Sequence, residues 1–168
     1  MTEVLVKRII EAFGFIAVVG SLIFVGLEVR QNSVAIRAET NASVANAFIQ
    51  QNQMLASTPE LAAAWARSAA IPEAASVEDA LQLLGAWRAV FHIWSNAHRQ
   101  HMNGTLDPVL FESVVQEISN YAGGQLNDGA HESVAHRIRM MRWAWQSERF
   151  VYNSEFQLFV DNLIDVED

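Results

Sequence analysis

The longest uninterrupted apolar stretch of the chain lies near its N-terminus. Residues Ala12–Leu27 carry no charge and are flanked by Glu11 and Glu28. Sixteen helical residues cover roughly 24 Å, slightly less than the hydrocarbon core of a bilayer, which is about 30 Å thick. Apolar residues on both sides lengthen the stretch to residues 9–29, which places both glutamates near the lipid headgroups, where charges are tolerated. The pattern therefore predicts a single membrane-spanning helix in contact with lipid over residues 9–29.

Two other interpretations fit an apolar run of this length. Runs shorter than eighteen residues are often core helices of soluble proteins. A basic pair before an apolar run, here Lys7-Arg8, is also typical of a cleaved signal peptide. However, the first Ala-x-Ala sequence, Ala45–Ala47, lies some twenty residues too late for a cleavage site, which argues against cleavage. We expect the segment to be a retained anchor.

Small residues share one face of the predicted span. Gly14, Ala17 and Ser21 follow i, i+3, i+7 spacing, so they lie on the same side of a helix. Small side chains let a second helix approach closely in a membrane. Glycine is also simply frequent in membrane helices. We expect this face to pack in the membrane against the span of a protein partner or of a second copy.

The helical pattern continues beyond the span and predicts one helix from about residue 4 to 55. Within it, five residues recur at every seventh position: Leu27, Val34, Asn41, Phe48 and Leu55. One interpretation is a coiled coil whose asparagine sets the register. The interpretation we favour is that the later part of this helix packs in an intramolecular bundle.

About five further helices follow, each with a recognisable start. The predicted starts are Thr58-Pro59, the capping box Ser76–Asp79, Asp107-Pro108, a position near Ala130, and Ser154 as the cap of the last helix. The long helix that starts at Ser76 ends at Asn103-Gly104 and carries a core stripe at helical spacing: Leu83, Trp87, Val90, Trp94 and Ala97. The predicted fold is all-α, with an anchor helix over residues 1–30 and a soluble helical domain over residues 31–168.

Composition and charge narrow the class of partner. The net charge is −8, and from Gln31 onward eight arginines stand against sixteen acidic residues. Nucleic-acid binding requires a basic face, so we expect no nucleic-acid partner. The same charge disfavours a domain that lies flat on anionic lipid. There is no cysteine, which excludes disulfides and thiolate chemistry.

The histidines do not form a recognisable metal motif. His131 and His136 are five residues apart, whereas the zinc-protease helix places its histidines at i and i+4 on one face. At i+5 they diverge by about 140°. His98 and His101 have helical spacing but no carboxylate within a turn. Nucleophile-elbow, phosphate-loop and dinucleotide motifs are also absent from the sequence. We therefore predict no enzymatic activity, no cofactor and no metal site.

Arginine and tryptophan cluster in one otherwise acidic region. Arg139, Arg142 and Trp143 occupy neighbouring helical positions, and arginine beside an aromatic ring can bind a carboxylate, a phosphate or an acidic partner surface. The alternative is a solvated face whose ion pairs contribute little stability. Arg88 could likewise form a polar seam with Ser95 and His98.

Three stretches carry a family resemblance: Ser21–Asn32, with the pattern Ser-Leu-Ile-Phe-Val-Gly-Leu-x-x-Arg-Gln-Asn; Gly104–Asp107; and Trp145–Asp161, with Arg149, Phe156 and Phe159-Val160-Asp161. The chain resembles a broad family of small bacterial proteins in which an N-terminal membrane span precedes a helical domain. That family has no established activity, so the resemblance implies no catalytic residue. Its members tend to carry arginines just after the span, which implies a cytoplasmic domain. Here Lys7 and Arg8 balance Arg30 and Arg37, so the charges by themselves give no orientation.

The sequence leads to two functional hypotheses. The first is a non-enzymatic, single-pass anchored module of a bacterial inner membrane, acting as an accessory or assembly subunit of a larger complex. The second is a membrane-anchored sensor domain that binds a small anionic ligand through Arg139, Arg142 and Trp143.

Overall fold

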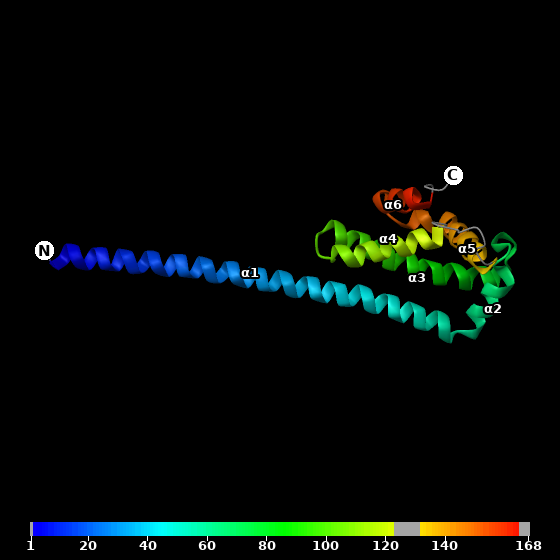
Figure 1. Cartoon of the computed structure of the whole chain (residues 1–168), viewed down its shortest axis with the longest axis horizontal. Coiled ribbons are helices and arrows are strands. Elements are labelled where there is room, and N and C mark those ends of the chain that lie inside the picture. The colour runs from blue at the N-terminus through cyan, green and yellow to red at the C-terminus, as the bar shows by residue number, and fades with distance from the viewer. Residues whose placement is uncertain (1, 123–131, 165–168) are drawn as a thin grey trace. The chain divides into compact units, whose positions relative to one another are not determined.

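The chain is built from α-helices throughout its described part. A computed structural model describes residues 2–122 and 132–164, in which there are six α-helices, two short 3-10 helices and no strand (Figure 1). The α-helices are α1 (Thr2–Ser57), α2 (Pro59–Ser68), α3 (Val77–Met102), α4 (Pro108–Ala122), α5 (Glu132–Glu148) and α6 (Ser154–Ile164), and the 3-10 helices are η1 (Pro72–Ala74) and η2 (Arg149–Val151). The predicted all-α class is confirmed.

The chain divides into two units, one up to Glu39 and one from Thr40 onward. The boundary lies within α1, so the end of that helix belongs to the second unit.

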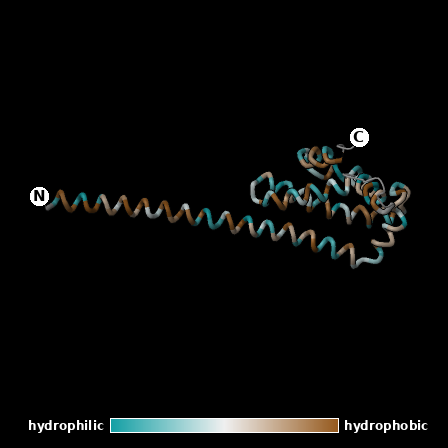
Figure 2. Tube along the Cα trace, in the orientation of Figure 1, coloured by the Kyte–Doolittle hydropathy of each residue, from teal (hydrophilic) through white to brown (hydrophobic). Residues whose placement is uncertain are grey.

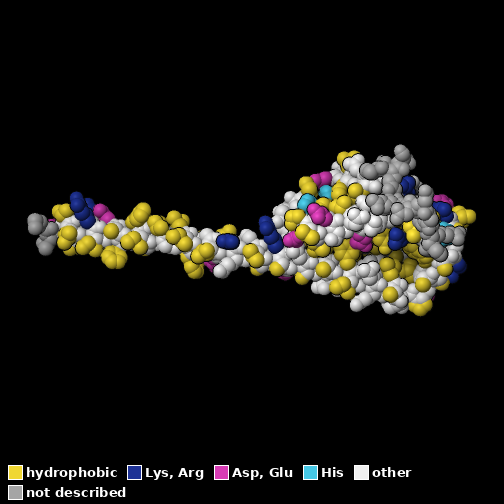
Figure 3. All heavy atoms as spheres, in the orientation of Figure 1, with side chains coloured by type: hydrophobic (Ala, Val, Ile, Leu, Met, Phe, Trp, Pro, Cys, Tyr) yellow, Lys and Arg dark blue, Asp and Glu magenta, His cyan; other side chains and the backbone are white. Residues whose placement is uncertain are grey.

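The first unit is a helix with an apolar surface. Hydrophobic residues dominate the N-terminal half of α1, and charged side chains are few there (Figures 2 and 3). The Ser21 hydroxyl donates to the Ala17 carbonyl at 3.0 Å, which satisfies this polar side chain within its own helix. Among the described residues, α1 is the one helix long and apolar enough to cross a membrane, by length and composition.

The second unit is a helical bundle whose core centres on α3. Four large side chains of α3 are almost completely buried: Leu83, Trp87, Phe91 and Trp94. Ala97 extends this stripe, whereas Val90 is only half-buried. From α5 and α6, the largest buried contributions to the same cluster are Met140, Met141, Trp145, Phe156 and Val160. The predicted stripe is therefore confirmed, with Val90 packed against its edge.

The last part of α1 packs into this bundle. Val44 is buried, and Phe48 and Leu55 pack against the core. Gln51 donates from Nε2 to the Ala86 carbonyl at 3.3 Å, and Asn41 Oδ1 accepts from the backbone N–H of Asp107 at 3.0 Å. The second half of the seven-residue repeat thus serves intramolecular packing, as the favoured interpretation predicted.

The start of α3 follows its predicted capping signal in part. Ser76 Oγ accepts from the Asp79 N–H at 3.1 Å, as in a capping box. The Asp79 carboxylate does not complete the box, because it pairs with Arg67 of α2 at 2.5 and 3.0 Å. This guanidinium holds the pKa of the Asp79 carboxyl below its usual range. A capping residue here also joins two helices. Gly104, just after α3, has φ +70°, a left-handed conformation that favours glycine.

The cap of the last helix differs from the prediction. Ser154 is the first residue of α6, and the side chain that caps the helix belongs to Asn153, whose Oδ1 accepts from the Phe156 N–H at 2.8 Å. Both residue types are strong N-caps, so composition could not distinguish them.

Candidate functional site

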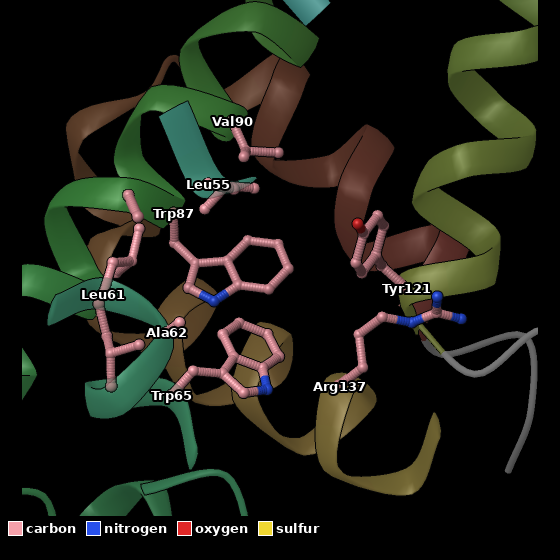
Figure 4. Close-up of a pocket in the computed structure, with 10 residues that line it drawn as sticks. Leu55, Leu61, Ala62, Trp65, Trp87, Val90, Tyr121 and Arg137 are labelled. Atoms are coloured by element: carbon pink, nitrogen blue, oxygen red, sulfur yellow. The ribbon is translucent and has the colours of Figure 1, made fainter. Parts of the chain in front are cut away.

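A pocket of about 250 Å³ opens among five helices of the second unit. It lies where the last turns of α1 and α4 meet α2, α3 and α5, and most of its wall is apolar (Figure 4). The lining residues are Leu55, Leu61, Ala62, Trp65, Leu83, Ala86, Trp87, Val90, Tyr121 and Arg137.

Three aromatic rings form much of the wall. The Trp65 and Trp87 ring centroids are 6.2 Å apart, and Tyr121 meets Trp87 edge-to-face at 5.4 Å. Figure 4 shows the rings of Trp87 and Trp65 on one side of the space and Tyr121 with Arg137 on the other. Trp87 is only 4% exposed and also stacks on Phe91, so the core holds this part of the wall in place.

The polar side chains of the pocket are mostly hydrogen-bond donors. Indole and guanidinium groups donate and do not accept, and a neutral tyrosine hydroxyl does both. Trp87 Nε1 and Arg137 Nε are buried and have no hydrogen-bond partner in the described structure. The Arg137 guanidinium lies over the Tyr121 ring, 4.9 Å from its centroid. The Ala86 carbonyl is already bonded by Gln51.

Burial raises the pKa of two neighbouring acidic groups. The pKa of Tyr121 is raised by burial and by the nearby Glu117 carboxyl, with Arg137 acting in the opposite direction. The pKa of Glu117 is itself raised by burial. Arg137 is the charged member of the set that lines the pocket. The site therefore combines aromatic walls, donor groups and one positive charge.

The structure does not bring the predicted arginines together. Arg139, which is exposed, donates to the carbonyl of Ala70, just beyond the end of α2. Arg142 donates to the Ala122 carbonyl at 3.0 and 3.1 Å and to the Ile164 carbonyl at 3.3 Å. These two carbonyls belong to the last residues of α4 and α6, where helix dipoles favour a cation.

Trp143, the third member of the predicted set, is half-buried and packs against the core. All three side chains thus have partners within the chain. Their role in binding an anion or a partner stays a prediction.

The small-residue face of α1 is open in the described part of the chain. Beyond the neighbouring residues and backbone of its own helix, no heavy atom lies within 4 Å of where a Cβ at Gly14 would stand, and Ala17 and Ser21 are exposed. Packing of another helix on this face stays a prediction.

The expected polar seam around Arg88 has a different composition. Arg88 binds both carboxylate oxygens of Glu148, at 2.8 and 2.9 Å, and its carbonyl accepts from the Tyr152 hydroxyl at 3.3 Å. His98 lies instead in an aromatic cluster, with its ring centroid 4.6 Å from that of Phe159.

The histidines do not gather with acidic groups in the described residues. No group of three or more histidine, cysteine or acidic side chains is placed to hold a metal ion in residues 2–122 and 132–164. His131 lies outside this range.

Sequence reasoning missed the pocket because its residues are scattered along the chain. Arg137 stands beside the predicted cluster, but no local signal distinguishes it from Arg139 and Arg142. Trp65 and Trp87 belong to different helices, and only the packing of α2 on α3 sets their rings side by side.

Comparison with known proteins adds no relative. No protein-family model matches the chain, and no curated protein or solved structure is significantly similar to it. What the chain does is therefore inferred from its own residues.

Proposed function

We propose that this chain is a non-enzymatic, single-pass membrane module that serves as an accessory or assembly subunit of a larger bacterial inner-membrane complex. The observation that supports it is the apolar, exposed segment of α1. Phe13, Phe15 and Leu22 are 69%, 71% and 66% exposed. A soluble monomer rarely exposes a contiguous apolar patch above a few hundred Å². Each large apolar side chain gains about 1.5–3 kcal/mol on leaving water, so lipid is the natural surrounding for this segment.

The small-residue face gives the module a means of docking. Gly14, Ala17 and Ser21 leave a shallow strip along α1 into which another transmembrane helix fits closely. The Ser21 hydroxyl already bonds within the helix, so contact with an apolar neighbour leaves no donor unpaired.

The anchoring step is tested by alkaline carbonate extraction of membranes that contain the protein. We expect the chain to stay in the membrane pellet and to dissolve in mild detergent. Ile16→Arg, near the centre of the span, adds about 2.5–3.5 kcal/mol to the cost of insertion and should move protein to the wash. Release of the unmodified chain by carbonate would contradict the proposal.

The docking step is tested by affinity isolation of the tagged chain from native membranes in mild detergent. We expect a stoichiometric membrane partner, lost when leucine replaces both Gly14 and Ser21. Val19→Leu is the matched control, because Val19 lies about 140° or more around the helix from this face. If the chain is a monomer and retrieves no partner, the accessory-subunit proposal is wrong.

Orientation is tested by cysteine labelling, since the chain has no cysteine of its own. We propose that the helical domain faces the cytoplasm. A Gln146→Cys variant places a thiol at an exposed position of α5. A membrane-impermeant maleimide should label this thiol only after the inner membrane is permeabilised. Labelling in intact spheroplasts would show that the domain faces the opposite side of the membrane.

The alternative of a sensor site at Arg139, Arg142 and Trp143 has weaker support. The guanidinium groups of Arg139 and Arg142 bind different backbone carbonyls, so an anion would have to displace these bonds.

A further inference from the structure

We propose that the pocket among α1–α5 binds a small planar aromatic carboxylate. This inference goes beyond the docking proposal and does not depend on it, because all lining residues belong to the second unit.

The volume of the pocket sets the size of the ligand. A dry apolar cavity of about 150 Å³ is large enough to bind benzene. The pocket here measures about 250 Å³, which suits one or two fused rings with a short polar substituent. A full lipid acyl chain or a peptide segment would extend beyond this volume.

The walls favour a flat ring. Trp65, Trp87 and Tyr121 present ring faces and edges to the same space, and aromatic groups gain from offset or edge-to-face contact beyond the burial of area. Leu55, Leu61 and Val90 complete the lining and contribute contact without polar atoms.

The charged group of the pocket favours a ligand with acceptor atoms. Arg137 is the lining residue that carries a charge, and its guanidinium is a planar donor fork that matches a carboxylate. Trp87 Nε1 and Arg137 Nε are buried without a partner, so a ligand reaches these two atoms only when the side chains shift. A neutral hydrocarbon would leave the guanidinium without an acceptor, and an aromatic amine would add a cation beside Arg137.

One acidic group near the pocket is shifted toward its uncharged form. Glu117 interacts with Tyr121, but burial raises the pKa of this carboxyl and so favours its uncharged form. In a chain of net charge −8, Arg137 therefore marks this pocket as the place where a small anion is accepted.

The test uses the full chain in detergent micelles and a matched ligand series followed by isothermal titration calorimetry. The probes are indole-3-acetate, the neutral indole-3-ethanol and the cationic tryptamine, which share one ring system. We expect the carboxylate to bind at least about tenfold more tightly than the alcohol, and the amine to bind most weakly. Equal affinities for the carboxylate and the alcohol would overturn the proposed charge recognition. No binding of indole-3-acetate, benzoate or naphthalene-2-carboxylate up to about 10 mM would overturn the site itself.

Variants then assign the binding to the pocket. Arg137→Gln should weaken the binding of indole-3-acetate about tenfold and leave the affinity for indole-3-ethanol unchanged. Arg137→Lys keeps the charge but loses the planar donor fork, so its affinity for indole-3-acetate should lie between those of the unmodified chain and Arg137→Gln. Arg99→Gln is the control, because Arg99 is exposed on α3 and its side chain donates to Asn96 of the same helix. Circular dichroism checks that each variant is folded. If Arg137→Gln does not fold, the ligand series on the unmodified chain still decides the proposal. An unchanged affinity in a folded Arg137→Gln would contradict it.

Discussion

At the scale of single residues, ion pairs between a buried carboxylate and an exposed guanidinium join neighbouring helices. Arg67 pairs with Asp79 between α2 and α3, and Arg88 pairs with Glu148 between α3 and the end of α5. In each pair the carboxylate is far less exposed than the guanidinium. The pKa of Tyr152, beside the second pair, rises to about 12 through burial and the Glu148 carboxyl, which keeps its hydroxyl available to the Arg88 carbonyl.

The cap of α6 gives the first prediction. Asn153→Ala removes the acceptor of the Phe156 N–H and should lower the free energy of unfolding by about 1 kcal/mol. Ser154→Ala is the matched control, since Ser154 is exposed and already inside the helix, and we expect a change below about 0.5 kcal/mol. Urea unfolding followed by circular dichroism measures both. A larger effect at Ser154 than at Asn153 would show that the serine is the functional cap.

His98 gives a prediction about pH. Burial lowers the pKa of this histidine, with Glu155 opposing and His101 reinforcing the shift. The unfolded chain therefore binds a proton more readily than the folded one, so stability falls as pH drops below the ordinary histidine value of about 6.5. We expect the Tm to fall between pH 7.5 and pH 5.5, and to fall less in His98→Phe, which does not titrate. Glu117, with a raised pKa, acts in the opposite direction in both proteins, so the difference between them isolates His98. If Tm depends on pH in the same way in both proteins, His98 is not the cause of the loss of stability at low pH.

At the scale of elements, α3 is the helix around which the second unit is built. Its buried face carries Trp87, Phe91 and Trp94, and Phe91 contacts Trp145 of α5 and Tyr152 beyond η2 at ring distances of 5.2 and 6.4 Å. The same face supports the pocket, because Leu83, Ala86 and Trp87 lie on it. Stability of the bundle and shape of the pocket thus depend on one helix.

The third prediction tests this role of α3. Phe91 is fully buried, so Phe91→Ala should lower the free energy of unfolding by about 3–5 kcal/mol. Leu81→Ala, on the same helix at a position that is 69% exposed, should change it by less than about 0.5 kcal/mol. Chemical unfolding in mild detergent, read by circular dichroism, measures the two. A Phe91 effect below about 1 kcal/mol would mean that the core relaxes around the missing ring.

At the scale of the whole molecule, the chain combines an apolar helix with a bundle that contains its own core. The first buried residue of that core is Val44, and all other members follow it in sequence. Since a domain with its own core can fold alone, the bundle does not need residues 1–39 for its packing.

The fourth prediction follows from this division. A chain that begins at Thr40 should be soluble without detergent and should keep a cooperative unfolding transition, because the complete buried cluster is present. Size-exclusion chromatography and thermal unfolding measure the two properties. Aggregation of the shortened chain, or loss of its cooperative transition, would show that the first unit contributes to the stability of the second.

The local features of this protein were predictable from the sequence. The length of the apolar run, the Thr58-Pro59 start of α2, the Ser76 cap of α3 and the end of α3 before Gly104 all rest on interactions within a few residues. The all-α class follows from the same signals. The cap of α6 was missed by one position because Asn153 and Ser154 are nearly equivalent as caps, and the choice depends on backbone geometry.

Only the tertiary structure decided which distant residues meet. The pocket needs Trp65, Trp87, Tyr121 and Arg137 from four different helices, and no periodicity along the chain links them. Arg139 and Arg142, adjacent in the predicted cluster, bind carbonyls at different places because the ends of α2, α4 and α6 lie there. Local hydrogen bonds and apolar periodicity are encoded within one or two helical turns. The partner of a long side chain depends instead on how the helices pack against one another. That packing results from many small contact energies summed over the whole bundle.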